Sequence, residues 1–183
     1  LAFALGPRLN AGGRLGESDL GWRLLTTDDV ALARQLALRL NELNGERQAL
    51  EQRTLDQAMA AAATQVAADR PVLLAAGPEW HPGVVGIVAA RLVERFARPA
   101  LVVALDGAVG KGSGRSIQGY DLGAAVTAAR QAGLLTAGGG HAILHRRALA
   151  QHGAAQHARA GLARQFGGVV GGTVVDDDHL GGR

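Results

Sequence analysis

DGAVGKGSGRS, at residues 106–116, is the stretch that decides the fold and around which the chain is organised. Glycine lets the backbone approach a ligand closely and adopt a positive φ, and successive exposed N–H groups then form a concave nest for an anion. Lys111 and Arg115 add full charges, and the planar arginine fork suits phosphate. The G-x-x-x-x-G-K-[ST] spacing of a Walker loop is absent. The stretch predicts a phosphate-binding loop or strand edge, and the alternative is a glycine-rich hairpin with incidental charges.

The segments on either side of this stretch alternate between strand and helix patterns. Short apolar runs at residues 72–76 and 100–105 predict buried strands. Residues 84–96 and 121–131 have helical patterns, and the first of these is closed by Pro99. Strand, helix, strand and helix in this order predict a small α/β layer domain.

A long helix is predicted ahead of this domain, over residues 28–68. Leucines at positions 32, 36, 40 and 43 recur at three- and four-residue steps, and the opposite face carries charges of both signs, which is typical of a solvated face. Thr26 or Thr27 is the expected N-cap. An unbroken helix would be roughly 60 Å long at 1.5 Å per residue. That exceeds the diameter of a small domain, so we expect a connecting helix, either continuous or broken near residues 44–45.

The two ends of the chain lack this clear periodicity. Residues 5–15 are glycine-rich and are predicted to be a loop that carries Arg8, Asn10 and Arg14, either as a second phosphate contact or as a solvated segment. The tail after residue 142 is rich in Ala, Gly, Gln, Arg and His and is predicted to be poorly ordered, with one short helix. Its histidines fit no standard metal-ligand spacing.

Composition sets limits on the class of protein. The chain has no cysteine, which excludes disulfides, thiolate nucleophiles and cysteine zinc sites and fits a reducing compartment. Neither a membrane-spanning run nor a signal-peptide pattern is present, so we expect a soluble, cytoplasmic protein. The net charge is only +3, so nucleic acid would have to bind through a local cluster and not through a field over the whole surface.

Two further positions carry candidate chemistry. Trp80 and His81 precede a proline and a glycine at the start of a predicted helix. Trp80 stacks a nucleic-acid base under one interpretation, and under the other it anchors the core while His81 caps the turn. His141 follows three glycines, which suits contact with phosphate or a role in proton transfer, although a buried structural histidine is the alternative.

Four segments together resemble the C-terminal part of the RecJ single-stranded-DNA exonucleases, members of the DHH phosphoesterase superfamily. The segments are GPRLNAGGRL at 6–15, WHPGVVGIVAARL at 80–92, GSGRS at 112–116 and GGHA at 139–142. The WHPG block that opens the second segment is specific to RecJ-like members, whereas the SGRS and GGH elements of the third and fourth are shared more widely. Their order and spacing match over about residues 5–142.

The resemblance implies an α/β fold in which a long connecting helix leads to a small DHHA1-type domain with a mixed sheet. Residues 1–25 would end a DHH domain, 26–69 would be the connecting helix, 70–142 a DHHA1 nucleic-acid-binding domain that is incomplete, and 143–183 an atypical, poorly ordered tail. In the family, the DHH domain holds two Mn²⁺ or Mg²⁺ ions, and single-stranded DNA threads a groove. The implied partners are single-stranded DNA and the missing N-terminal DHH domain, with no membrane.

The resemblance also implies roles for residues. Arg14 matches an arginine that binds the 5′ phosphate end, Ser113 and Arg115 match residues that bind substrate phosphate, and His141 matches the catalytic-cleft histidine. The remaining candidates for binding nucleic acid or phosphate are Arg8, Asn10, Trp80, His81, Lys111 and Ser116.

Two departures from the family pattern bear on function. The chain has no Asp-His-His motif, so we expect it to bind no metal and to be inactive alone as a fragment of a 5′-to-3′ exonuclease. Residues 143–147 interrupt the family pattern, and we hypothesise a reading-frame error that sequencing of the coding DNA would test. The alternative functions are a non-catalytic module that binds single-stranded nucleic acid and a fragment of a small-nucleotide phosphoesterase.

Overall fold

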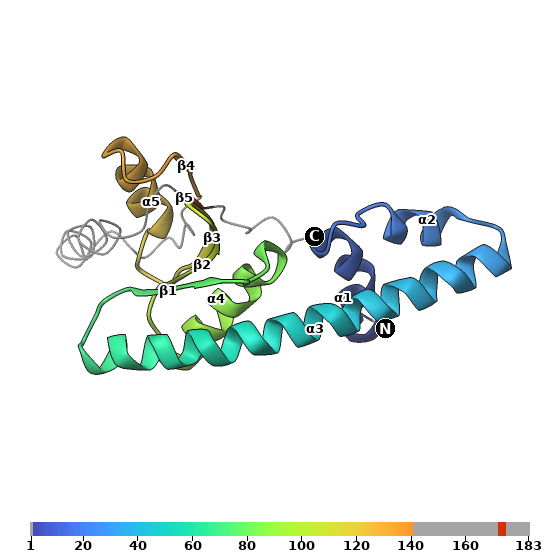
Figure 1. Ribbon diagram of the computed structural model, residues 1–183, viewed down its shortest axis with the longest axis horizontal. Helices are drawn as coiled ribbons and strands as arrows, with labels where there is room; N and C mark the ends of the chain where they lie inside the picture. The colour runs from blue at the N-terminus through green and yellow to red at the C-terminus, as the bar shows by residue number, and fades with distance from the viewer. Residues whose placement is uncertain (1, 141–171, 175–183) are drawn as a thin grey trace. The chain divides into compact units, whose positions relative to one another are not determined.

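The computed structural model of the chain describes residues 2–140 and 172–174 (Figure 1). They fall into two compact units, Leu1–Arg53 and Thr54–Arg183. Helix α3, Val30–Ala67, contributes residues to both units. None of the helices in the described residues is long and apolar enough to span a membrane.

Helix α3 confirms the predicted long helix and continues through residues 44–45 without a break. Its 38 residues correspond to about 57 Å at 1.5 Å per residue. The predicted N-cap was wrong, because Asp29 takes that place. Its Oδ1 accepts hydrogen bonds from the backbone N–H of Ala31 (2.8 Å) and Leu32 (3.1 Å). A carboxylate satisfies two open donors there and is favoured by the positive end of the helix dipole.

The first unit contains α1, Ala2–Arg14, α2, Leu20–Thr26, and the start of α3. The prediction of a loop at residues 5–15 is therefore wrong. Ala11 of α1 and Leu20 of α2 pack with three leucines of α3 to form one buried cluster, and this burial favours helix despite the glycines. The leucines are Leu36, Leu40 and Leu43.

Helix α1 ends in a Schellman motif. Gly16 has φ +97°, and the N–H of Glu17 donates a 2.8 Å hydrogen bond to the carbonyl of Gly12. The reversal brings the carbonyl of Glu17 against the Cα of Gly12, where a Cβ would lie only 2.4 Å from that oxygen. Gly16 therefore supplies the left-handed conformation, and Gly12 supplies the space.

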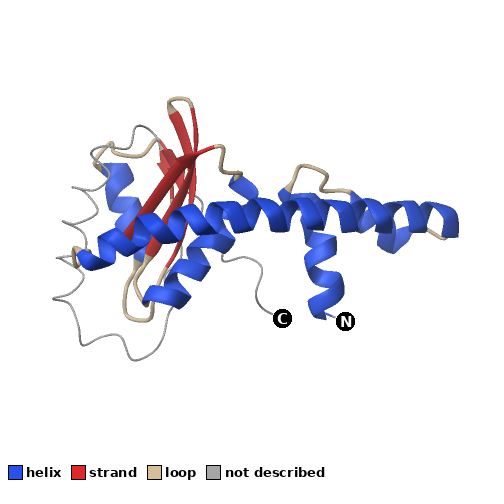
Figure 2. Cartoon of the chain, turned by 60° about the horizontal axis from the view of Figure 1, so that its bottom comes forward, coloured by secondary structure: helices blue, strands red, loops and turns tan. Residues whose placement is uncertain are grey.

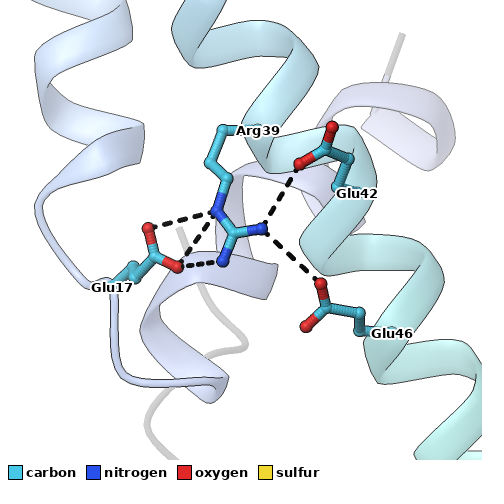
Figure 3. Close-up of polar contacts among 4 residues, drawn as sticks. All are labelled: Glu17, Arg39, Glu42 and Glu46. Carbon is cyan, nitrogen blue, oxygen red and sulfur yellow. Dashed lines mark hydrogen bonds and ion pairs between the residues drawn. The ribbon is translucent and has the colours of Figure 1, made fainter.

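Arg39 of α3 binds the side chain of Glu17, at the end of this turn (Figure 3). Its guanidinium donates to the Glu17 carboxylate, with Nε 3.1 Å from Oε1, and lies 3.3 Å from Glu42 and 3.5 Å from Glu46. The hydrogen bond to Glu17 is the main reason that the pKa of Arg39 is raised, and Glu42 adds to it. The pairs are solvent-exposed and are screened by salt, so their main effect is to fix the loop between α1 and α2.

The second unit is built on a mixed sheet with the strand order β1-β2-β3-β5-β4 among the described residues. The strands are β1, Leu73–Pro78, β2, Ala100–Asp106, β3, Val109–Arg115, β4, Ala137–Gly138, and β5, Gly172–Val174. Strand β2 pairs in parallel with β1 and antiparallel with β3, whereas β5 is parallel to both β3 and β4. The two predicted strands are confirmed as β1 and β2, and a mixed sheet is present as expected.

Strand β5 falls within the tail, to which the sequence assigned no strand. The other tail residues, and with them the predicted short helix, lie outside the described residues. The expected incompleteness of the domain and the suggested reading-frame error stay predictions.

Helices cover both faces of the sheet (Figure 2). The predicted helices are confirmed as α4, Pro82–Phe96, and α5, Leu122–Gln131. On one face, α4 and the end of α3 pack on Ala100, Val102 and Ala104. On the other face, α5 packs on Leu101. Alternate β2 residues thus point to opposite faces, as the twofold period of a strand requires.

Candidate nucleic-acid interface

Lys111, Ser113 and Arg115 lie in a row on one face of β3. They stand opposite Ala104, Val102 and Ala100 of β2, the residues that face α4. Directly opposed residues of an antiparallel pair share a face, and alternate residues of one strand do the same. The strand therefore places an ammonium, a hydroxyl and a guanidinium on the α4 side of the sheet.

The glycines of β3 occupy the opposite face and have a packing role. A Cβ on Gly112 would lie 2.9 Å from Val103, and one on Gly114 would lie 2.7 Å from Leu122 and 2.8 Å from Leu101. Positive φ is found instead at Gly107, in the turn between β2 and β3. The predicted anion nest of glycine N–H groups is therefore wrong. This segment is a regular strand, and its glycines leave room for the leucines and valine beneath it.

Ser113 and Arg115 are linked by hydrogen bonds. Nη1 of Arg115 donates to Oγ of Ser113 (3.2 Å) and to the carbonyl of Gly114 (2.8 Å). Ser113 is buried, with 6% of its surface exposed, whereas Arg115 is half-buried and Lys111 is exposed. These hydrogen bonds restrict the half-buried guanidinium, so that less side-chain freedom would be lost if it bound an anion.

Trp80 anchors the core of the second unit. It is 8% exposed and packs in the cluster of α3, α4 and the sheet, and its Nε1 donates to Oε1 of Gln57 at 2.5 Å. His81 is the N-cap of α4, where its Nδ1 accepts from the N–H of Gly83 at 3.0 Å. Both are structural roles, a core anchor and a helix cap, which are the alternative to base stacking at this turn. The stacking of a base on Trp80 stays a prediction that this burial does not support.

The other binding candidates fall into two places. Ser116 follows β3, and its Oγ donates to the carbonyl of Tyr120 at 2.5 Å, which closes the loop before α5. Arg8, Asn10 and Arg14 are all on α1, in the first unit. Arg8 donates to Oδ1 of Asn41 at 2.9 Å and to the carbonyl of Ala4 at 2.6 Å, so it tethers α1 to α3.

His141 lies outside the described residues, but the residue before it is placed. A Cβ on Gly123, in the first turn of α5, would lie 2.9 Å from the carbonyl carbon of Gly140. Gly123 therefore lets the segment that leads to His141 lie directly against α5. Gly123 and Gly86 are not among the site residues predicted from the sequence, although Gly86 faces Ser113 and Arg115. A sequence signal for both residues exists, because a glycine inside a helical pattern indicates that another part of the chain packs closely against it.

Comparison with known proteins identifies the domain. Residues 69–167, which include the whole of β1 to β4 and helices α4 and α5, match the DHHA1 domain family.

The chain belongs to the DHHA1 domain family.

Relatives of this DHHA1 chain include exonucleases. It is 43% identical over 124 residues to the single-stranded-DNA-specific exonuclease RecJ of Bacillus subtilis. The matched region covers 67% of this chain and 16% of that relative. It is also similar to the crystal structure of RecJ in complex with Mg²⁺ from Thermus thermophilus, with a TM-score of 0.68 and 31% identity over 95% of this chain and 27% of that one. The crystal structure of exonuclease RecJ bound to manganese matches 71% of this chain and 32% of that one, with a TM-score of 0.62 and 38% identity.

The chain thus spans about a sixth to a quarter of the length of the curated RecJ relatives that it matches. Within residues 2–140 and 172–174, no three His, Asp or Glu side chains are grouped so that they could hold a metal ion. The described part of this DHHA1 chain therefore does not fit the Mn²⁺ or Mg²⁺ of those crystal structures. That the chain binds no metal stays a prediction.

Proposed function

We propose that this DHHA1 domain grips the phosphate backbone of single-stranded DNA as the substrate-binding part of a RecJ-like 5′-to-3′ exonuclease. The observation that supports the proposal most is the row of Lys111, Ser113 and Arg115 on one face of β3. Charged and hydroxyl donors spaced along a strand suit a repeating anion, and contacts to phosphate carry no sequence information directly. Similarity to RecJ proteins supplies the substrate class.

The proposal assigns Arg115 the strongest contact, because its fork can give two hydrogen bonds to one phosphate. Replacing Arg115 by alanine should weaken binding by roughly 10- to 100-fold, the loss expected for one charge-assisted hydrogen-bonded contact. All sequences should be affected alike, and the slope of log affinity against log salt should fall by about 0.7. Fluorescence anisotropy with labelled oligonucleotides over a salt series measures both quantities.

Arg130→Ala is the matched control, since it removes the same charge from the last turn of α5, the helix on the opposite face of the sheet. Its salt slope should stay close to that of the parent. A loss for Arg115→Ala confined to certain sequences would mean that Arg115 reads bases. Binding of dinucleotides as tightly as of long strands would favour the small-nucleotide phosphoesterase instead.

In this proposal, the metal ions that support hydrolysis are bound by another part of a RecJ-like protein. The first unit exposes large apolar side chains, which we propose are covered by a DHH domain; they are Phe3, Leu5, Trp22, Leu25, Val30 and Leu38. The chain alone should show no turnover of single-stranded DNA with Mn²⁺, and adding a separately produced RecJ DHH domain should restore it. Robust turnover by the chain alone would contradict this assignment.

Within the same proposal, Arg14 binds the 5′ phosphate and His141 acts at the reacting phosphate. Arg14→Ala should remove any preference for 5′-phosphorylated over 5′-hydroxyl strands in the binding assay. His141→Ala should abolish turnover in the reconstituted enzyme while leaving strand binding in place. An unchanged preference or an unchanged rate would remove that residue from the site.

A further inference from the structure

Helix α4 carries a glycine where it crosses the candidate phosphate contact. Gly86 is buried on the side of α4 that meets β3. A Cβ at this position would lie 3.1 Å from Oγ of Ser113, 3.3 Å from Nη2 of Arg115 and 3.5 Å from Cβ of Ser113. The hydroxyl and the guanidinium therefore lie directly against the helix backbone.

The helix itself gives no reason for this glycine. Glycine in a helix interior is less favourable than alanine, because more backbone freedom is lost on folding. Gly45 of α3 shows the contrast, since a Cβ there meets nothing within 4 Å. At Gly86 the space that a methyl group would take is occupied by the side chains of Ser113 and Arg115, so the glycine permits their close approach to α4.

Ser113, Gly114 and Gly86 all contact the Arg115 guanidinium. Oγ of Ser113 and the carbonyl of Gly114 accept from Nη1, and the backbone of Gly86 borders Nη2. A methyl group at position 86 makes contacts tighter than those usual for a Cβ with both Oγ and Nη2. Because Ser113 is buried under α4, the guanidinium is the group with more room to move, and it would turn away from its present direction.

We infer that Gly86 is a positioning residue that sets the direction of the Arg115 guanidinium for phosphate. The inference rests on the proposed function of Arg115 in binding single-stranded DNA. Gly86 touches no substrate in this account and acts through Ser113 and Arg115.

A double-mutant cycle on the full chain tests the inference. Gly86→Ala should weaken binding of a labelled single-stranded oligonucleotide by about 3- to 10-fold and lower the salt slope toward that of Arg115→Ala. In the Arg115→Ala background, the same change should weaken binding by less than about twofold, since the group through which it acts is gone. Gly45→Ala should leave binding unchanged in both backgrounds. Equal losses in both backgrounds would mean a general structural effect and would overturn the inference.

A measurement without DNA separates the inference from the proposed function. The Nε–Hε resonance of Arg115, assigned by NMR from its loss in Arg115→Ala, should shift in Gly86→Ala and stay in place in Gly45→Ala. If the parent chain fails to bind single-stranded DNA, the proposed function fails, and the resonance still reports whether Gly86 directs the guanidinium. An unshifted Arg115 resonance in Gly86→Ala would overturn the positioning role even if the parent binds DNA tightly.

Discussion

Replacing Trp80 by alanine is expected to lower the free energy of unfolding of the second unit by about 3–5 kcal/mol, the range for truncating a large buried aromatic side chain. The indole is 8% exposed and packs between α3, α4 and the sheet. It also covers Gly77, where a Cβ would lie 2.4 Å from Cε2 of the ring. The substitution would leave a cavity above Gly77 and remove the donor that bonds Gln57.

Trp22 provides the control, because it is the other tryptophan of the chain and is 70% exposed. Trp22→Ala should change the free energy of unfolding by no more than about 0.5 kcal/mol. Urea titration followed by far-UV circular dichroism measures both variants without depending on the tryptophan signal. Equal effects of the two substitutions would contradict the assignment of Trp80 to the core.

Trp80→Phe separates the core role from base stacking. Phenylalanine keeps an aromatic face but loses the bond to Gln57. We expect a smaller loss of stability than in Trp80→Ala and an unchanged affinity for single-stranded DNA. A loss of affinity in the folded Trp80→Ala protein, restored in Trp80→Phe, would revive the stacking hypothesis.

Gly12→Ala is expected to destabilise the first unit by about 1–3 kcal/mol, as overpacking in a well-packed site does. Alanine normally stabilises a helix interior by up to about 1 kcal/mol relative to glycine. In α1 this gain is outweighed, because the new methyl group would lie 2.4 Å from the backbone carbonyl of Glu17. A carbonyl in a Schellman turn that Arg39 also holds through the Glu17 side chain has little freedom to withdraw.

The neighbouring residue is the matched control. Gly13 is exposed and also in α1, and a Cβ there meets nothing within 4 Å. Gly13→Ala should be neutral or stabilising by up to about 1 kcal/mol. If thermal unfolding shows that Gly12→Ala lowers the stability and Gly13→Ala does not, the close approach of the Glu17 carbonyl to Gly12 is established. Two stabilising substitutions would show that the turn after α1 is looser than described.

Local pattern predicted most of the second unit correctly. Short apolar runs gave β1 and β2, and Pro99 and Asp121 marked the end and the start of the helices around β2 and β3. These signals work because strand burial, proline and helix capping act between residues that are close in the sequence. The glycine-rich stretch at residues 106–116 also contains the residues of the candidate interface on β3, where Arg115 donates a hydrogen bond to Ser113.

The structural roles of the glycines were predicted least well from the sequence. The glycines near residue 12 suggested a loop but belong to a helix, and those of β3 suggested an anion nest but belong to a regular strand. In both segments, the space left by glycine is occupied by atoms from residues outside the local pattern: the Glu17 carbonyl in one, and Leu101, Val103 and Leu122 in the other.

By itself, the sequence determined the strands β1 and β2, the helices α4 and α5 and the long helix ahead of them, and it predicted the charged residues proposed to contact phosphate. Only the tertiary structure decided that Trp80 is a core residue, that β3 turns its glycines toward α5 and its polar side chains toward α4, and that Gly86 borders Arg115. The reason is physical: periodicity and capping are set by neighbours along the chain, whereas the space available to a side chain is set by whatever the fold brings against it.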